Sequence, residues 1–405
     1  SREEIRSNDY NLNIPRYVDS SEAAEHWDVY ASMFGGIPTA EIEELGEFWT
    51  AFPALKKALF TESGIPYVNV SVDDIKSAIK SHPDVVGFED AFNAVFSTFP
   101  AFLKEELIDR MESIEISKAE TVLSADIFER LKDIPLIDKY AAFQLLDDDW
   151  TGISIDLEVL QTEGFSATKE VDPNLVIKKK DGKDQEVQEG WVGHIIPFDL
   201  VQATLLSAET DELHGLESRL AEIPSEYESI LDEMTEEDKE SCNDVLTEEG
   251  DAFVPKEVSK KIKELKKDRS PESVALRTLL EKVESLVKSE KEIKAEIKAK
   301  SAALQAKTKD TIERLSDEQA LDLLEKKWIA PLIESIHKLP DTVIDSLVSK
   351  IQALQNKYAT TFFEVEQQIS ETEATLSGMI DDLEGNEYDM LGLNELKKLL
   401  GGSAE

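Results

Sequence analysis

The chain has 405 residues, enough for two or three domains, and a formal net charge of −42. Such acidity argues against this chain alone gripping nucleic acid or an anionic membrane surface, since both need a basic face. Its single cysteine excludes a disulfide within the chain and favours a reducing, cytoplasmic compartment. No apolar run reaches the roughly 18 residues of a transmembrane helix, and the charged residues 1–4 are not typical of a signal peptide.

Residues 8–19 begin with the string NDYNLNIPRYV. Tyr10, Leu12 and Ile14 alternate and Pro15 follows them, which predicts a short extended segment. The string resembles the segment that closes the catalytic domain of M subunits, the DNA methyltransferase subunits of type I restriction–modification systems. A looser similarity to the same family covers residues 43–60 and 191–201.

The resemblance implies that residues 1–19 end an upstream N6-adenine methyltransferase domain, which would bind S-adenosylmethionine. The remainder would be the helical C-terminal region of a long-tailed branch of the family, docking onto the specificity subunit, with the restriction subunit as a further candidate partner. DNA would be contacted mainly through these partners. The chain has neither the family's Gly-rich turn nor its Pro-Pro loop, so no catalytic or cofactor-binding residue is assigned.

Residues 20–150 are predicted to form a helical domain. Apolar residues recur at steps of three and four over 40–59, and a Phe-rich stripe covers 87–110, a spacing more typical of a core than of a ligand pocket. Trp27 and Trp49 are interpreted as core residues. The run Asp147-Asp148-Asp149 offers hard oxygen ligands for Mg²⁺ or Ca²⁺, but consecutive helical side chains diverge, so no metal site is assigned.

Residues 151–200 are predicted to form a small antiparallel β element, with the sheet at about 151–192. Alternation of Ile153, Ile155, Leu157 and Val159 favours a strand, and Asp181-Gly182 predicts a hairpin turn. The turn is either a solvated tip or a contact for DNA phosphates, because basic residues flank it. These residues are Lys178, Lys179, Lys180 and Lys183.

The five histidines are scattered singly, which is not the spacing of a zinc site. His194 lies beside an apolar run and has no nucleophile or metal ligand spaced around it. It is therefore interpreted as a core or capping residue.

Residues 201–315 are predicted to form an antiparallel coiled-coil hairpin. Residues 209–251 contain 17 acids and 2 bases, whereas residues 256–300 contain 14 bases and 9 acids. An acidic helix followed by a basic one favours antiparallel pairing. Ser270 and Pro271 have the positions of an N-cap and a first helical residue.

Residues 316–405 are predicted to be C-terminal helices, opened by a capping box of Ser316 and Gln319. The longest, 341–383, carries a heptad seam with one irregular step at Tyr358. A helix of roughly 40 residues is about 60 Å long and cannot bury its seam alone, so it needs partner helices. The bulkiest part of the seam is predicted to be the inter-subunit interface: Tyr358, Phe362, Phe363, Val365, Ile369 and Leu376.

The predicted fold is therefore mainly α, with a small antiparallel sheet and long antiparallel coiled-coil helices in the C-terminal half. The favoured function is a non-catalytic interaction module that joins a methyltransferase domain to a specificity subunit. The alternative is a free-standing, self-associating coiled-coil structural protein. An enzyme is disfavoured because no nucleophile–base pair, paired-acid motif or phosphate loop is visible.

Overall fold

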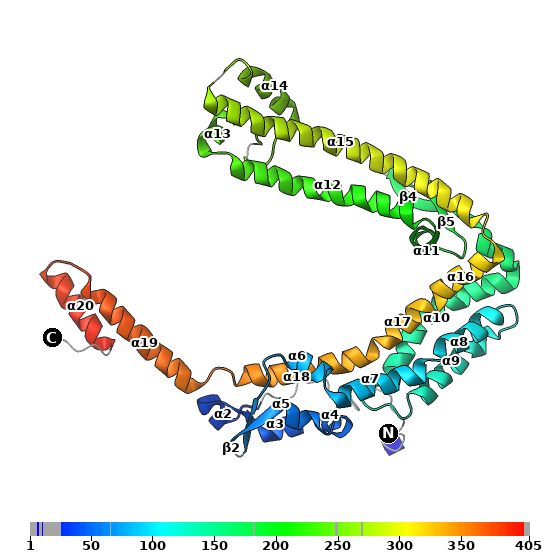
Figure 1. Cartoon of the computed structure of the whole chain (residues 1–405), viewed down its shortest axis with the longest axis horizontal. Helices are drawn as coiled ribbons and strands as arrows, with labels where there is room; N and C mark the ends of the chain where they lie inside the picture. Colours follow the sequence, from blue (N-terminus) through cyan, green and yellow to red (C-terminus); the bar gives the residue numbers. More distant parts are fainter. Residues whose placement is uncertain are drawn as a thin grey trace. The chain divides into compact units, whose positions relative to one another are not determined.

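The structure is a computed structural model that describes residues 6–7, 10, 26–64, 66–180, 183–247, 250–268 and 270–400 (Figure 1). It is mainly helical with a small content of antiparallel strands, as predicted. Apart from Tyr10, the segment 8–19 lies outside the described residues. The described parts fall into two compact units that are discontinuous in sequence, whereas the predicted boundaries followed chain order.

Unit 1 comprises the described residues of Ser1–Val95, Arg130–Asp138 and Lys338–Glu405. It contains a three-stranded antiparallel sheet of order β1-β3-β2 and a set of mostly short helices. Its elements are α2 (Val29–Phe34), β1 (Ile37–Pro38), α3 (Thr39–Glu43), α4 (Gly46–Ala51), α5 (Leu55–Leu59), β2 (Phe60–Gly64), β3 (Tyr67–Val70), α6 (Ile75–Lys80), most of α7 (Pro83–Phe96), α18 (Leu339–Lys357), α19 (Phe362–Asp381) and α20 (Glu387–Leu399).

Helix α18 completes the core of unit 1, although it lies some 250 residues beyond the rest of that core in sequence. Ile344, Leu347 and Ile351 are fully buried among the side chains of residues 31–88. Two ion pairs fix α18 against α6: Lys80 Nζ to Asp341 Oδ1 at 2.6 Å and Lys76 Nζ to Asp345 Oδ1 at 2.9 Å. The apolar residues in the first half of the predicted seam are therefore buried by other parts of this chain and do not need a partner.

The prediction of one continuous helix over 341–383 is wrong, because the chain leaves the helix between α18 and α19. Tyr358 ends α18 with a non-helical backbone, and Thr361 starts α19 as an N-cap in an extended conformation. The Thr361 hydroxyl accepts the Glu364 N–H at 3.1 Å, while the Glu364 carboxylate accepts the Thr361 N–H at 3.0 Å. This capping box gives α19 its own start, so the irregular seam step marks a helix boundary.

Unit 2 comprises Phe96–Glu129 and the described residues of Lys139–His337. It is built from long helices and one β-hairpin. Its elements are α8 (Phe99–Leu103), the π-helix η2 (Lys104–Asp109), most of α9 (Ile116–Arg130), α10 (Lys139–Glu163), the 3₁₀-helix η3 (Phe165–Lys169), β4 (Val171–Lys180), β5 (Lys183–Gly193), α11 (Phe198–Leu205), α12 (Ser207–Glu233), α13 (Glu236–Ser241), α14 (Pro255–Leu265), α15 (Pro271–Ile312), α16 (Asp317–Trp328) and α17 (Ala330–His337).

The strand predicted over 153–159 is instead the second half of α10. The side chains that α10 buries follow a helical spacing, and Ile155, which the strand pattern required on the core face, is exposed. Asp156 is buried there because its Oδ2 accepts hydrogen bonds from Lys327 Nζ and from Trp328 Nε1, the latter at 2.7 Å. Nothing in the sequence interrupts the helix before Gly164, whose φ is 87°.

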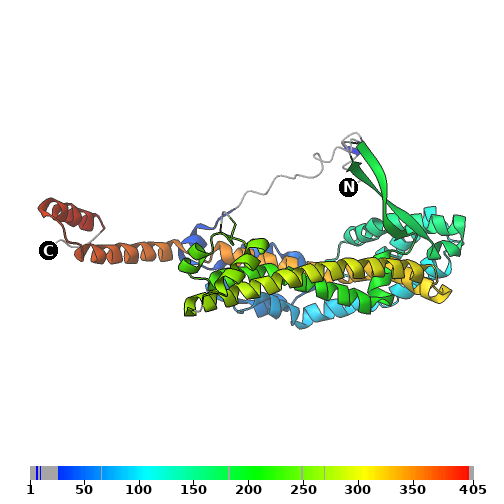
Figure 2. The same cartoon turned by 90° about the horizontal axis from the view of Figure 1, so that it is seen from above.

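The predicted hairpin is confirmed in β4 and β5, which form a long two-stranded antiparallel ribbon (Figure 2). Val176 lies opposite Val187, and the register shifts between Pro173 and Leu175. The Asp181-Gly182 turn lies outside the described residues.

Helices α12 and α15 lie side by side and run antiparallel. Lys307 and Lys300 near the end of α15 pair with Glu209 and Glu212 at the start of α12, and Lys282 pairs with Glu233 at its end. This is the orientation that the acidic-then-basic charge pattern predicted. Ser270 caps α15, as expected, by accepting the Ser273 N–H at 3.3 Å.

Around the C-terminal end of α12, a small core forms between α12, α14 and the first part of α15. We call it the tip cluster; its members include Ile230, Cys242, Val258, Leu280 and Val283. It closes the end of the α12–α15 pair with a buried apolar centre of its own.

Candidate interaction surfaces

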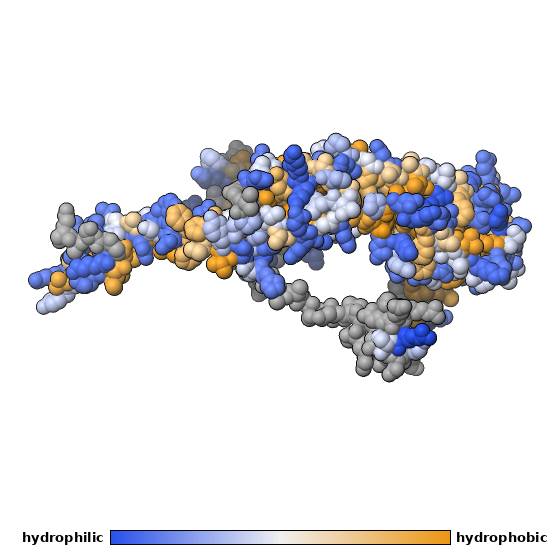
Figure 3. Space-filling model, turned by 90° about the horizontal axis from the view of Figure 1, so that it is seen from below, coloured by the Kyte–Doolittle hydropathy of each residue, from blue (hydrophilic) through white to orange (hydrophobic). Residues whose placement is uncertain are grey.

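Helix α19 of unit 1 carries a run of exposed apolar side chains. From Phe362 to Leu376 every residue of this helix is exposed, and burial begins only at Ser377. The space-filling view shows apolar side chains along α19 and α20 among hydrophilic ones (Figure 3). An amphipathic helix whose apolar face is left in water gains little stability from packing, so this face is suited to a partner.

The structure separates the predicted interface residues into two groups. The first group is exposed on α19, with Ile369 at 53% and Leu376 at 45% of full exposure. This group contains Phe362, Phe363, Val365, Ile369 and Leu376.

Tyr358 forms the second group, because only 4% of it is exposed and it belongs to the core of unit 1. Its hydroxyl donates to Glu41 and accepts the Asp28 N–H at 3.2 Å. Burial, together with the hydrogen bond to Glu41, raises the pKa of Tyr358. A residue held in this way cannot serve an inter-subunit seam, so the prediction for Tyr358 is wrong.

Sequence reasoning missed an aromatic patch beside the start of α19. Trp27, Tyr30 and Phe34 are each more than half exposed, and Tyr30 stacks on Tyr67 with centroids 4.9 Å apart. Helix α2, which carries Tyr30 and Phe34, contacts α19. The spacing of the three aromatics, at steps of three and four residues, was the available signal. The interpretation of Trp27 as a core residue is wrong.

Helix α20 folds back on the last turn of α19. Lys397 pairs with both carboxylate oxygens of Asp381, at 2.7 and 2.8 Å, and Ser377 and Ile380 become buried. Leu376 and Met379 stay exposed, so α20 covers only one side of α19.

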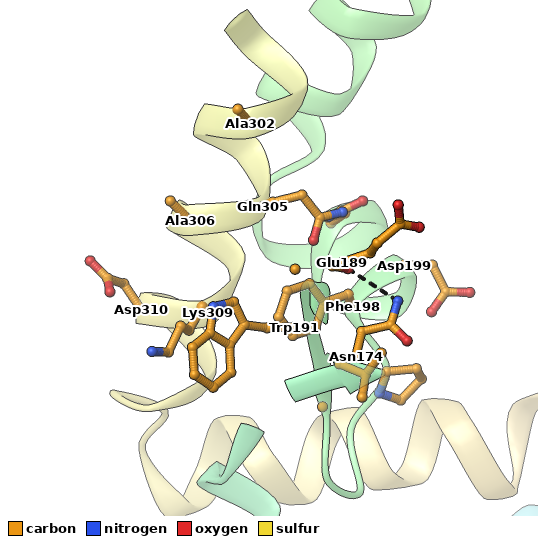
Figure 4. A pocket seen from close by; sticks show the side chains of 15 residues that line it. Asn174, Glu189, Trp191, Phe198, Asp199, Ala302, Gln305, Ala306, Lys309 and Asp310 are labelled. Atoms are coloured by element: carbon orange, nitrogen blue, oxygen red, sulfur yellow. Dashed lines mark hydrogen bonds between the residues drawn. The ribbon is translucent and has the colours of Figure 1, made fainter. Parts of the chain in front are cut away.

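A second candidate surface is an open groove of about 990 Å³ between the base of the hairpin and α15 (Figure 4). Trp191 and Phe198 form much of its apolar lining, and Lys309 Nζ lies 3.8 Å from the centre of the Trp191 ring. Its other charged lining groups are acids, including Asp199 and Asp310. With its one lysine held on the indole, the groove is suited to binding an apolar or cationic side chain and offers no nucleophile–base pair.

The chain runs very close to itself at the base of this hairpin. A Cβ on Gly193 would lie 1.8 Å from the Ile196 carbonyl oxygen, so only glycine fits. His194 follows, with Nδ1 2.6 Å from Asp172 Oδ2 and Nε2 3.1 Å from Glu163 Oε2. The hydrogen bond to Asp172 is the main reason that the pKa of His194 is raised. His194 thus ties α10 to β4, and a half-buried contact with two carboxylates replaces its interpretation as a core or capping residue.

The four lysines lie at the ends of β4 and β5 next to the turn, and Lys179 is paired in register with Asp184. Lys179 is exposed, while the side chains of Lys178, Lys180 and Lys183 lie outside the described part. DNA contact by these lysines stays a prediction.

Gln144 holds two members of the Asp147–Asp149 run, since its amide donates to Asp147 at 3.3 Å and to Asp148 at 2.8 Å. Across the described ranges, no three His, Cys, Asp or Glu side chains gather in a way that could hold a metal ion. Nor does any helix there combine the length and apolar content needed to cross a membrane.

Comparison with family models, curated proteins and solved structures found no match to this chain.

Proposed function

We propose that this chain is a non-catalytic interaction module that joins an N6-adenine DNA methyltransferase domain to the specificity subunit of a type I restriction–modification assembly. The observation that carries the proposal is the exposed apolar face of α19, which is a continuous surface for a partner helix. The resemblance of residues 8–19 to the M-subunit family supplies the identity of the partners.

In this proposal α12 and α15 act as an antiparallel coiled-coil arm, and α19 with α20 forms the docking end. S-adenosylmethionine would be bound by the upstream domain, and DNA sequence would be recognised by the specificity subunit in the cytoplasm. The restriction subunit is a further candidate partner. The net charge of −42 supports the assignment of DNA recognition to the specificity subunit, because it limits DNA binding by the chain itself.

The test is the solution mass of the chain alone and mixed with the specificity subunit from the same operon, measured by light scattering on a sizing column. We expect a monomer alone and a stable complex in the mixture. Ile369→Asp with Leu376→Asp should abolish the complex, whereas Val122→Asp, at an exposed apolar residue of α9, should not. A tight homodimer that ignores the specificity subunit would overturn the proposal and favour the self-associating structural protein.

A further inference from the structure

The apolar residues of α19 keep a strict seven-residue repeat. Phe362, Ile369 and Leu376 recur at one heptad position. Val365, Thr372 and Met379 recur three residues after them. These two rows have the spacing of a coiled-coil seam, and all six side chains are exposed.

The charge around this seam has one sign only. Between Thr361 and Glu395 the chain has 10 acidic residues and no lysine, arginine or histidine. Glu366 and Glu373 lie directly beside the seam, at the position that faces the flank of a partner helix. Within the described part of the chain, neither has an ion-pair partner.

A second copy of α19 is a poor match for this surface. In an antiparallel pair, Glu366 and Glu373 would face the same glutamates of the other copy, which places like charges together. In a parallel pair they would face Thr361 and Gln368, which provide no cation. Neither the antiparallel nor the parallel pair would place a cation beside Glu366 and Glu373.

Building on the proposed function, we infer that the seam of α19 binds a heterologous amphipathic helix whose own heptad seam is flanked by lysine or arginine. The apolar rows supply affinity for any seam of matching spacing. The free glutamates select the cationic partner and reject the chain's own copy.

Two labelled helical peptides test this inference on the full chain. They share one leucine–isoleucine heptad seam and differ only in carrying lysine or glutamate at the flanking positions. In fluorescence anisotropy we expect the lysine peptide to bind about tenfold more tightly at low salt, with the ratio shrinking as salt rises.

Glu366→Lys with Glu373→Lys should reverse the preference. The matched control is Glu237→Lys with Glu240→Lys on α13, which changes the net charge equally at another exposed acidic helix and should leave the preference unchanged. Ile369→Asp with Leu376→Asp should abolish binding of both peptides. Circular dichroism checks that each variant keeps its helical content.

Equal binding of both peptides, binding of neither, or a homodimer that Ile369→Asp with Leu376→Asp dissolves would each overturn the inference. The proposed function fails separately. If the specificity subunit is captured but the peptides are not distinguished, only the charge selection is wrong. If the lysine peptide is preferred but the subunit is not captured, the helix-binding surface stands and the assignment to a restriction–modification assembly falls.

Discussion

Tyr358 lies at the point where the buried half of the predicted seam ends. Its ring fills the core of unit 1, and the hydroxyl is shared between Glu41 and the Asp28 N–H. Lys357 Nζ also contacts Glu41 Oε2 at 2.8 Å, so the carboxylate is held by two neighbouring residues at the end of α18. These polar contacts hold the point at which α18 ends, and this point separates the buried from the exposed half of the predicted seam.

Tyr358→Phe should lower the free energy of unfolding by about 1–2 kcal/mol, because it removes the Glu41 hydrogen bond and leaves the Asp28 N–H without its acceptor. Urea denaturation measures the change. Tyr388→Phe is the control, since Tyr388 is 83% exposed and should change stability by less than about 0.5 kcal/mol. Equal effects from both variants would show that the buried hydroxyl contributes nothing.

His194 predicts a pH dependence with a defined sign. Its pKa is raised from 6.5, mainly by the hydrogen bond to Asp172, so the folded chain binds the proton more tightly than the unfolded chain. The stabilisation is therefore complete below about pH 6.5 and is lost as the pH rises through the higher, folded pKa.

We expect the stability difference between the wild type and His194→Gln to shrink as the pH rises through this window, in urea denaturation series at several pH values. His214→Gln, at an exposed histidine of α12 in the same unit, is the control and should show no such trend. A difference that grows with pH would contradict the contact described for His194.

At the scale of elements, α19 depends on its own cap more than most helices do. Its residues from Phe362 to Leu376 are all exposed, so packing stabilises them little and the Thr361–Glu364 capping box is a main source of local order.

Thr361→Ala should cost about 1 kcal/mol of local stability and raise amide exchange in the first turns of α19 about fivefold. Hydrogen exchange measured by mass spectrometry would report it. Thr375→Ala, in the middle of the same exposed helix, is the control and should not raise exchange, because alanine is the better helix former. If both variants raised exchange alike, the cap would have no special role.

How far the sequence predicts these elements depends on whether local signals compete. Ser316 with Gln319 and Ser270 with Pro271 were identified correctly because each cap is a local motif with one meaning. The alternation over 153–159 was misleading, since the same stretch also contains the helical set of Trp150, Ile153, Leu157 and Leu160 that α10 buries.

The candidate site was predictable in part. Five of the six predicted interface residues lie on the exposed face of α19, because a heptad repeat is visible in sequence. The burial of Tyr358 was not visible, since it depends on Asp28 and Glu41, more than 300 residues away in the chain. The heptad periodicity identifies the seam, but it does not show which half of the seam is buried by other residues of the same chain.

At the scale of the whole molecule, unit 1 and the tip cluster of unit 2 each have an apolar core of their own. Cys242 reports on the tip cluster, because its thiol is fully buried and burial raises its pKa. Both effects suppress its reaction with thiol reagents until the cluster opens.

Leu280→Ala should destabilise the tip cluster by about 2–5 kcal/mol and accelerate labelling of Cys242 by at least about tenfold. The matched control is Ile351→Ala in the core of unit 1, which should leave the labelling rate unchanged. Labelling followed by mass spectrometry makes the comparison. Acceleration by Ile351→Ala to the same extent would mean that the two cores open together.

The absence of cationic residues between Thr361 and Glu395 also determines which chemistry can detect a bound partner. Lys357 and Lys397 are the nearest lysines in sequence on either side of the seam, and Lys397 is engaged with Asp381. Reagents that bridge two amines therefore have no anchor between these two lysines, and trypsin has no cleavage site between them. Carbodiimide coupling, which joins carboxylates directly to lysines, would instead link Glu366 or Glu373 to a cationic partner helix and leave a tryptic peptide that identifies the contact.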